Sequence, residues 1–298
     1  MSHLCPHVFR HSIMSALLGG IGAAVLWALG FAVPAGAPAA DRVVAPGVIS
    51  TEAAEVRVAY RPDGRQVVWG SIGRDADPDQ QDIWEMHRMD KGWSRPARAS
   101  FDTDAIEFDP AFSSDSQQLF FDSDRPGGYG GTDVYVVEVD LKTNRFSVPR
   151  NLGPTVNSKA DEWAPEPTSR GTLIFSSDGW GGEGKHDLFE SDIGSARAPR
   201  NLGPAINGPE EDFDAALAPD GKTLVFSSGA MSDTAAHVRL FRSEYKGNAW
   251  TARQELAVGC SDFIIGASFA ADHPNVLYYA AKCSDGLGRM DIRQVDLR

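Results

Sequence analysis

One pattern of apolar and polar positions recurs along the chain at a nearly constant interval. Each copy consists of a short strand-like run, a polar turn and a second run that is apolar or alternating. The copies are YRPDGRQVVWGS (60–71), FSSDSQQLFFDS (112–123), PTSRGTLIFSSD (167–178), LAPDGKTLVFSS (217–228) and FAADHPNVLYYA (269–280). Corresponding residues lie 50 to 55 positions apart. Five copies at this interval indicate a repeat protein.

Each copy continues into further strand-like segments. An apolar run starts at Asp82, Asp133, Asp187, Arg239 and Asp291, and in most units a stretch such as FSVPRNLGPTVNS comes after it. The first turn is often Pro-Asp-Gly, in which Pro fixes φ and Gly accepts a positive φ. Each unit therefore predicts four short strands. Such units predict an all-β fold, the β-propeller of four-stranded blades, because the repeats of a β-solenoid are shorter.

The two ends of the chain are expected to share a blade. The fifth unit ends after DIRQVDLR (291–298), its third strand, and so lacks a fourth. The segment RVVAPGVIS (42–50) resembles the missing strand. We therefore expect the N-terminal strand to complete the last blade, which closes the ring and removes exposed strand edges. Five repeats are visible in the sequence, with six blades as the alternative.

The second unit carries a motif of a known kind. Its sequence SDRPGGYGGTDVYVVEVD (123–140), preceded by FSSDSQQLFFD, resembles the WD-like propeller repeat of the TolB-like family. The resemblance covers about residues 52–298, and it implies an exported propeller, although members of the family usually have six blades. Such repeats occur in periplasmic scaffolds of envelope complexes and beside the catalytic domains of peptidases, so the resemblance leaves the function open.

The glycine-rich run GGYGG is expected to be a tight loop and not a phosphate site. A phosphate loop leads into a helix N-terminus, whereas the strand DVYVVEV follows here. We expect Asp133 and the preceding Ser-Asp-Arg to hold this loop through side-chain hydrogen bonds and an Asp–Arg pair.

Residues 1–39 have the pattern of a signal peptide. Arg10 precedes 21 uncharged residues (13–33), and Ala37-Pro38-Ala39 fits the small-residue rule of signal peptidase. We expect cleavage after Ala39, which leaves a single propeller domain at 40–298, periplasmic or secreted and without a membrane span. The alternative is an uncleaved anchor, since the apolar run is long enough to cross a bilayer.

Two cysteines remain after cleavage, Cys260 and Cys283. They flank a predicted hairpin of strands 262–269 and 276–282, whose register places them almost opposite each other. In an oxidising compartment this arrangement predicts a structural disulfide. The dispersed histidines, His186 among them, show no zinc-ligand spacing.

The net charge of −13 argues against nucleic acid as a partner, because binding to phosphate backbones depends on Lys and Arg. Part of this charge recurs just before or within the first strand of each unit, and first strands line the channel of a propeller. The candidate binding residues are Glu55, Glu107, Asp109, Glu162, Asp212, Asp214 and Asp262. Such a ring would focus negative potential at one mouth of the channel.

The simplest alternative is that these carboxylates cap turns. A second is a site for a cation, with calcium as the possible ion, or for a basic partner. A third is the pair of carboxylates that a glycosidase uses. Trp180, in a glycine-rich loop, is a candidate rim aromatic.

These features favour a non-enzymatic, exported propeller that binds a protein or another component of the cell envelope. A carbohydrate-active enzyme that uses the channel carboxylates is the first alternative, and a structural module that binds a divalent cation is the second. No catalytic residue or cofactor is assigned apart from the possible calcium, and the oligomeric state is not predicted.

Overall fold

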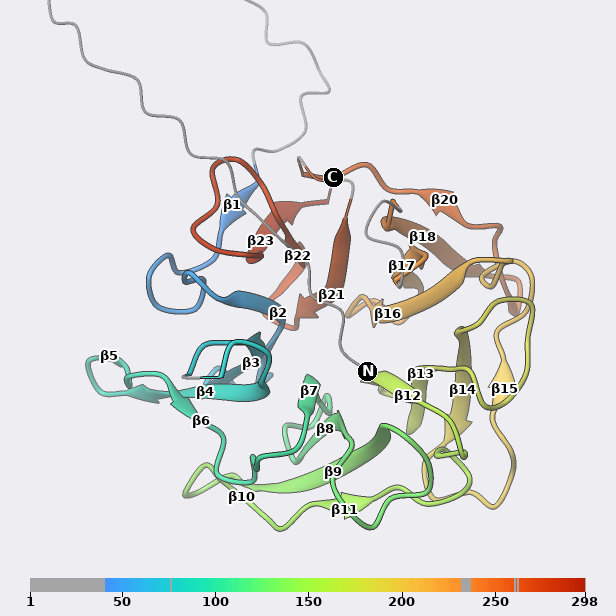
Figure 1. The fold of residues 1–298 in the computed structure, drawn as a ribbon. Coiled ribbons are helices and arrows are strands. Elements are labelled where there is room, and N and C mark those ends of the chain that lie inside the picture. Colours follow the sequence, from blue (N-terminus) through green and yellow to red (C-terminus); the bar gives the residue numbers. More distant parts are fainter. Residues whose placement is uncertain (1–40, 76, 232–236, 260, 262, 298) are drawn as a thin grey trace, which may run out of the picture. The chain divides into compact units, whose positions relative to one another are not determined.

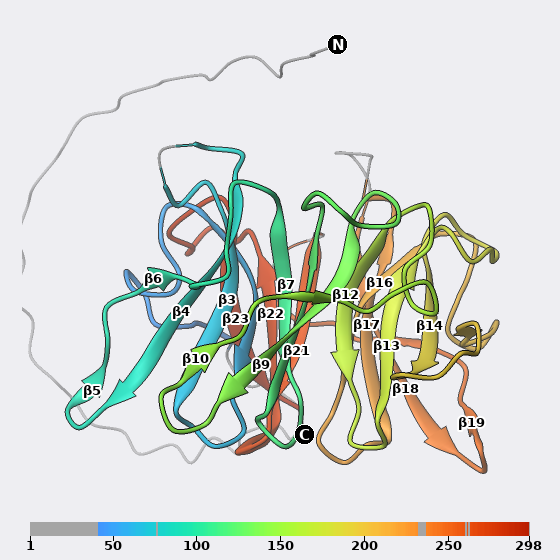
Figure 2. The same cartoon turned by 90° about the horizontal axis from the view of Figure 1, so that it is seen from below.

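The computed structural model describes residues 41–75, 77–231, 237–259, 261 and 263–297. Within them, all the regular elements are strands, and these form five antiparallel sheets arranged as the blades of a ring (Figures 1 and 2). The described residues belong to one compact unit, Pro38–Arg298. The predicted signal peptide at 1–39 lies outside them and stays a prediction. None of the described segments is a helix of the length and apolar character needed to cross a membrane.

Blade 1 consists of β2 (Ala54–Tyr60), β3 (Gln66–Ile72), β4 (Gln81–Met89), β5 (Gly92–Trp93) and β6 (Ala97–Arg98). Blade 2 consists of β7 (Glu107–Phe112), β8 (Gln118–Ser123), β9 (Asp133–Asp140), β10 (Arg145–Phe146) and β11 (Arg150–Asn151). Blade 3 consists of β12 (Glu162–Pro167), β13 (Thr172–Ser177), β14 (Asp187–Asp192) and β15 (Arg200–Asn201). Blade 4 consists of β16 (Glu211–Leu217), β17 (Thr223–Gly229), β18 (Arg239–Lys246), β19 (Ala249–Trp250) and β20 (Gln254–Glu255). Blade 5 consists of β21 (Ile264–Ala270), β22 (His273–Ala281), β23 (Asp291–Asp296) and β1 (Arg42–Val43).

The N-terminal strand completes the last blade, as the sequence predicts. β1 pairs antiparallel with β23, with Arg42 opposite Gln294 and Val43 opposite Arg293. The Asp41 carboxylate reinforces this junction, because its Oδ1 lies 2.9 Å from Nη2 of Arg293. The ring therefore has five blades and not six. The closing strand is shorter than the segment 42–50, since Ala45 begins a turn directly after β1.

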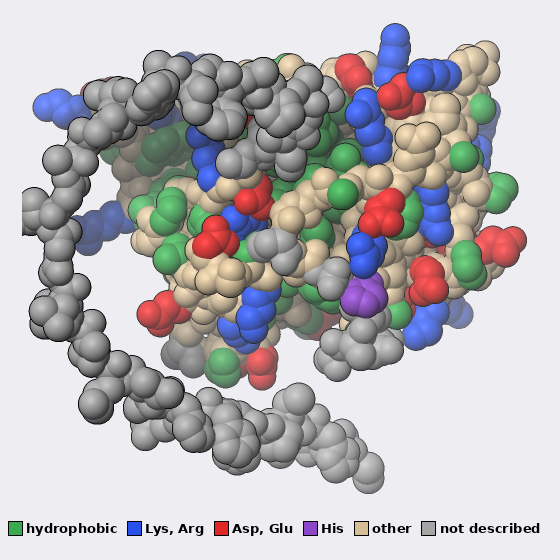
Figure 3. Space-filling view, turned by 90° about the horizontal axis from the view of Figure 1, so that it is seen from above, with side chains coloured by type: hydrophobic (Ala, Val, Ile, Leu, Met, Phe, Trp, Pro, Cys, Tyr) green, Lys and Arg blue, Asp and Glu red, His purple; other side chains and the backbone are tan. Residues whose placement is uncertain are grey.

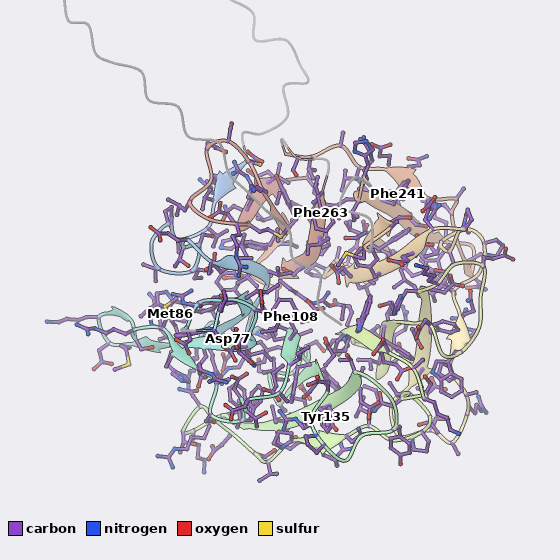
Figure 4. The ribbon with its side chains drawn as sticks, in the orientation of Figure 1. Asp77, Met86, Phe108, Tyr135, Phe241 and Phe263 are labelled. Carbon is purple, nitrogen blue, oxygen red and sulfur yellow. The ribbon has the colours of Figure 1, made fainter. Side chains whose placement is uncertain are left out.

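Apolar side chains hold each blade against the next. The cluster between blades 1 and 2, for example, joins Val68 and Ile83 to Leu119 and Phe121. Similar clusters lie at the other four junctions, including the one at which blade 5 meets blade 1. Met86 and Tyr135, labelled in Figure 4, belong to two of them. Short strands with apolar residues on both faces thus supply the core, because each blade is covered by two neighbours.

The innermost strand of every blade has the same irregularity, a β-bulge after its first residues. At this place the five blades carry residues with a positive φ of 46° to 65°: Arg57, Asp109, Ala164, Asp214 and Gly266. A positive φ is strained for residues other than Gly, and Asp tolerates it better than most. The fold therefore imposes this conformation on every blade, whatever residue stands there.

The glycine-rich loops are held as expected, with one correction. The Asp133 carboxylate accepts hydrogen bonds from the backbone N–H groups of Tyr129 (2.6 Å) and Gly130 (3.3 Å). Asp187 plays the same part in the loop of blade 3. The arginine of the motif, Arg125, pairs with Glu107 at 2.8 Å instead of with an aspartate. Each of these loops is followed by a strand and is held by the aspartate that begins this strand, which accounts for their recurrence.

The hairpin of blade 5 has two strands as expected, but they run over Ile264–Ala270 and His273–Ala281, so the turn is shorter than predicted. Ile264 pairs with Ala281 and Phe269 with Leu277, with an added bulge in between. Cys260 lies outside the described residues, so the disulfide between Cys260 and Cys283 stays a prediction.

Candidate functional site

Four of the predicted acidic residues begin inner strands and cap the loops that lead into them. Glu55, Glu107, Glu162 and Asp212 have fully buried side chains. Each carboxylate accepts a hydrogen bond from the backbone N–H four residues earlier, at distances of 2.7 to 2.9 Å. Ser123 also donates to Glu107, and Ser177 to Glu162. These contacts are those of the turn-capping alternative, and Asp262, the candidate in blade 5, lies outside the described residues.

A second set of polar residues lies two or four positions further along the inner strands and in β8. Arg57 reaches across the ring from blade 1: its Nη2 donates to Glu166 Oε2 (3.0 Å) in blade 3 and to the carbonyl oxygen of Ala215 (3.2 Å) in blade 4. Asp109 and Asp214, two of the predicted residues, lie close enough to this guanidinium for its charge to act on their pKa values, as does Asp122 of β8. We refer to Arg57, Asp109, Asp122, Glu166 and Asp214 as the channel cluster.

The channel cluster is buried and incompletely hydrogen-bonded. Arg57 is 1% exposed and Asp109 is 7% exposed. Among the described residues, Nε and Nη1 of Arg57 and Oδ1 of Asp109 have no hydrogen-bond partner. A buried polar atom without a partner costs free energy, and the great majority of such atoms in proteins are paired. The cluster therefore has donors and an acceptor to offer to a ligand or to water.

Burial also changes the protonation of the cluster. It raises the pKa of Asp122 to about 7 and that of Glu166 to about 7, against the attraction of Arg57. The pKa of Asp109 is well above its usual value for the same reason, and the neighbouring carboxylates of Asp214 and Asp122 raise it further. Burial raises the pKa of Asp214 too. Around neutral pH the cluster thus gains or loses protons readily, so its charge responds to what binds beside it.

A cavity of about 250 Å³ opens over the cluster, on the face where the first and second strands of the blades join. We call this the hairpin face, and the opposite face, where second and third strands are joined, the loop face (Figure 2). Arg57 and Glu166 form part of the cavity lining. Its walls carry one residue from the same repeat position of each blade, all half-buried: Tyr60, Phe112, Pro167, Leu217 and Phe269. We refer to these five residues as the collar. The site is thus a small pocket with an apolar collar and charged groups beneath it.

On the loop-face side of the channel cluster, the inner strands are joined by apolar contacts. Val56, Phe108, Phe213 and Ile265 each precede a bulge residue, and they belong to one buried cluster. Figure 4 shows Phe108 on the inner side of blade 2, nearer the middle of the ring than Met86 or Tyr135. The channel cluster therefore has apolar packing on one side and the cavity on the other.

Trp180 lies in the loop of blade 3 and is half-buried. Its Nε1 donates to the carbonyl oxygen of Val156 (2.9 Å), and the ring packs against the apolar cluster between blades 2 and 3. Its polar atom is thus used inside the fold.

Arg57, Asp122 and Glu166 are not predicted from the sequence, although the repeat register contains a signal for two of them. When the repeats are aligned, Arg57 occupies the same position as Asp109 and Asp214. At the position of Glu166, the other repeats carry small residues. Nothing in the spacing of Asp122 indicates that its carboxylate faces Arg57.

The channel cluster does not have the form of a metal site. The guanidinium of Arg57 stands among the carboxylates, where a cation would be repelled. Among the described residues, the one group with the mutual spacing of metal ligands is Asp161, Asp178 and His186 in blade 3. The sequence shows no zinc-ligand spacing around His186, because these residues lie at the ends of three different strands.

No family model and no curated protein matches the sequence. Solved structures match the fold: TolB from Acinetobacter baumannii is 15% identical, with a TM-score of 0.51 over 81% of this chain and 54% of that one. The putative TolB from Agrobacterium tumefaciens is 14% identical, with a TM-score of 0.52 over 83% and 78% of the two chains. A gluconolactonase from Xanthomonas campestris is also 14% identical, with a TM-score of 0.50 over 89% of each chain. This chain therefore spans about half of the Acinetobacter TolB, and the predicted resemblance to TolB-like propellers is confirmed for the fold.

Proposed function

We propose that this chain is an exported, non-catalytic β-propeller that binds a segment of a partner protein of the cell envelope at the hairpin-face mouth of its channel. The observation that carries the proposal is the pocket itself, in which the apolar collar surrounds buried donors of Arg57 that have no partner among the described residues. The likeness of the fold to TolB structures and the predicted signal peptide support an envelope location.

The dimensions of the pocket favour a protruding side chain over a sugar chain. Its volume of about 250 Å³ is below the range of roughly 300–1,000 Å³ that small-molecule sites usually have. The apolar part of such a side chain would fit the collar, where Phe112 and Phe269 are among the residues that would surround it. Below the collar lie the N–H groups of Arg57 that have no partner among the described residues, so the pocket favours a hydrogen-bond acceptor at the end of the inserted side chain.

The outer surface supports a protein partner better than a polyanion. Figure 3 shows one side of the molecule, and in its described part Lys and Arg are interspersed with Asp and Glu. The sequence carries a net charge of −13. A basic stripe, the usual mark of nucleic-acid binding, is not visible on the described part of this side.

The test compares two variants that add the same charge at different places. Leu217→Arg fills the collar with a positive group, whereas Val148→Arg adds that group on the outer edge of blade 2, where Val148 is 87% exposed. Both are used as tagged full-length chains to capture proteins from a cell-envelope extract, after circular dichroism has shown that they fold. The proposal predicts that Leu217→Arg loses the captured protein and Val148→Arg keeps it. Equal capture by both variants would contradict it.

A carbohydrate-active enzyme is the second candidate, because Glu166 lines the cavity and burial raises its pKa to about 7, the range of a general acid at neutral pH. Glu166→Gln separates the two functions. It abolishes hydrolysis of oligosaccharides if the chain is such an enzyme, and if the chain is a binding module no hydrolysis is seen with either form.

A further inference from the structure

Three side chains with metal-ligating atoms meet on the loop face of blade 3. Asp161 directly precedes β12, Asp178 directly follows β13, and His186 directly precedes β14. One candidate ligand atom from each of them lies within 4.8 Å of the other two. The antiparallel order of the three strands brings their ends together, although up to 25 residues separate them in sequence.

Both carboxylates are oriented by backbone hydrogen bonds. Asp161 Oδ1 accepts from the backbone N–H of Thr132 (2.7 Å), and Asp178 Oδ1 accepts from that of Asp161 (2.9 Å). Each aspartate therefore uses one oxygen for the fold and keeps Oδ2 as a candidate ligand. Asp178 is exposed, so its side chain has room to turn towards the imidazole.

His186 supplies the second, independent observation. Its side chain is buried, with 6% exposure, and neither ring nitrogen has a hydrogen-bond partner in the part of the chain that the structure describes. The ring stacks on Trp163, with centroids 3.7 Å apart and an angle of 18° between the planes. The stacking fixes the plane of the imidazole beside the two carboxylates but satisfies neither nitrogen. A buried histidine normally hydrogen-bonds or ligates through at least one of them.

Within the described part of the chain, the combination of two carboxylates and one imidazole is specific to blade 3. In blade 2, the corresponding residues are Ile106, Asp124 and Thr132. Asp124 accepts a hydrogen bond from the backbone N–H of Ile106 (2.7 Å), just as Asp178 does from Asp161. The aspartate after the second strand is thus part of the architecture of both blades. The carboxylate and imidazole added to it in blade 3 are not required by that architecture.

We propose that Asp161, Asp178 and His186 bind a divalent transition-metal ion of the zinc class. One imidazole nitrogen and two carboxylate oxygens form a donor set that suits Zn²⁺ better than Ca²⁺, which prefers oxygen alone. Three protein ligands leave a coordination position for water or for a group of a partner. The ion would connect three places in blade 3: the start of its first strand, the end of its second strand and the start of its third strand. This site is separate from the collar, which lies on the hairpin face.

The experiment is isothermal titration of Zn²⁺ into the tag-free full-length chain after treatment with EDTA, with Ca²⁺ as a second probe. Two variants remove ligands: Asp178→Asn keeps the acceptor for the backbone of Asp161, and His186→Phe keeps a ring against Trp163. Asp124→Asn is the matched control in blade 2. Comparison among these chains also cancels any Zn²⁺ bound by His3, His7 and His11, which all of them contain.

The proposal predicts that the unaltered chain and Asp124→Asn share a Zn²⁺ site that Ca²⁺ does not occupy. In Asp178→Asn and His186→Phe its affinity falls at least about tenfold, since even the loss of an outer partner of a ligand costs that much. Equal Zn²⁺ binding by the unaltered chain and Asp178→Asn would overturn the proposal. An equal loss in Asp124→Asn would overturn it as well.

Discussion

Two positions on the same inner strands differ sharply, although only one residue separates them. The strand-starting carboxylates, such as Glu107, recur in four blades and are satisfied by hydrogen bonds within their own blade. The bulge residues, such as Arg57 and Asp109, differ from blade to blade, have a positive φ and leave polar atoms without partners among the described residues. Repetition with complete hydrogen bonding indicates architecture, whereas variation in residue type with unmet hydrogen bonds points to function.

The largest expected effect is on the free energy of unfolding, which should differ between substitutions at the two positions. Glu107→Ala leaves Arg125, the Ser123 hydroxyl and a backbone N–H without their acceptor, and we expect it to lower the free energy of unfolding by about 3–5 kcal/mol. Asp109→Asn removes a carboxylate that its neighbours repel, and we expect a change of less than about 1 kcal/mol. Urea unfolding at neutral pH measures both values. Equal losses would break the distinction between the two positions.

The next effect concerns pH and the channel cluster. In the folded chain Asp122 keeps its proton up to a pKa of about 7, whereas in the unfolded chain it releases it near its ordinary value of 3.8. The folded state then binds more protons between these values, so this group stabilises at low pH and its contribution is lost as the pH rises towards 7. The expected slope is about 1.4 kcal/mol per pH unit for this proton.

Asp122→Asn removes this slope and keeps an acceptor for the backbone N–H of Ala164. Urea unfolding from pH 5 to pH 8 should therefore show a flatter profile for this variant than for the unaltered chain. Asp90→Asn, at an exposed position, is the control and should retain the original slope. A slope in Asp122→Asn equal to that of the unaltered chain would mean that Asp122 is not one of the groups that titrate in this range.

The smallest expected effect tests the strain at the bulge. Ala164 has a φ of 50°, and Ala111, on the inner strand of blade 2, is not among the residues with a positive φ. Ala111→Gly should cost about 1 kcal/mol, the usual penalty of Gly in a strand. Ala164→Gly should cost less than about 0.5 kcal/mol, because relief of the left-handed conformation offsets the flexibility that Gly adds. Thermal unfolding of the two variants resolves this difference, and equal costs would argue against strain.

Much of the fold could be predicted from the sequence because local chemistry encodes it. Pro-Asp-Gly turns and apolar runs at a fixed interval define blades, and the missing fourth strand of the last unit predicts that RVVAPGVIS closes the ring. The loop-tying aspartates, such as Asp133, also follow from their recurrence.

The candidate sites were less predictable because they depend on contacts between blades or between separate strand ends. The positive φ at Arg57 has no local signal, since a bulge with Gly, as at Gly266, is found in only one of the five units. The approach of Arg57 to Glu166 joins residues 109 positions apart. Likewise, the spacing of Asp161, Asp178 and His186 resembles no metal motif, and only the order of the strands brings them together.

The central claim is that the collar contacts the partner, and site-specific photo-crosslinking tests it most directly. A photo-reactive aromatic residue replaces Phe269 of the collar in one full-length chain and Val148 of the outer edge in another. Each chain is irradiated in cells that produce it. The account predicts a discrete crosslinked protein from position 269 and none from position 148. No adduct from position 269, or the same adduct from both positions, would contradict it.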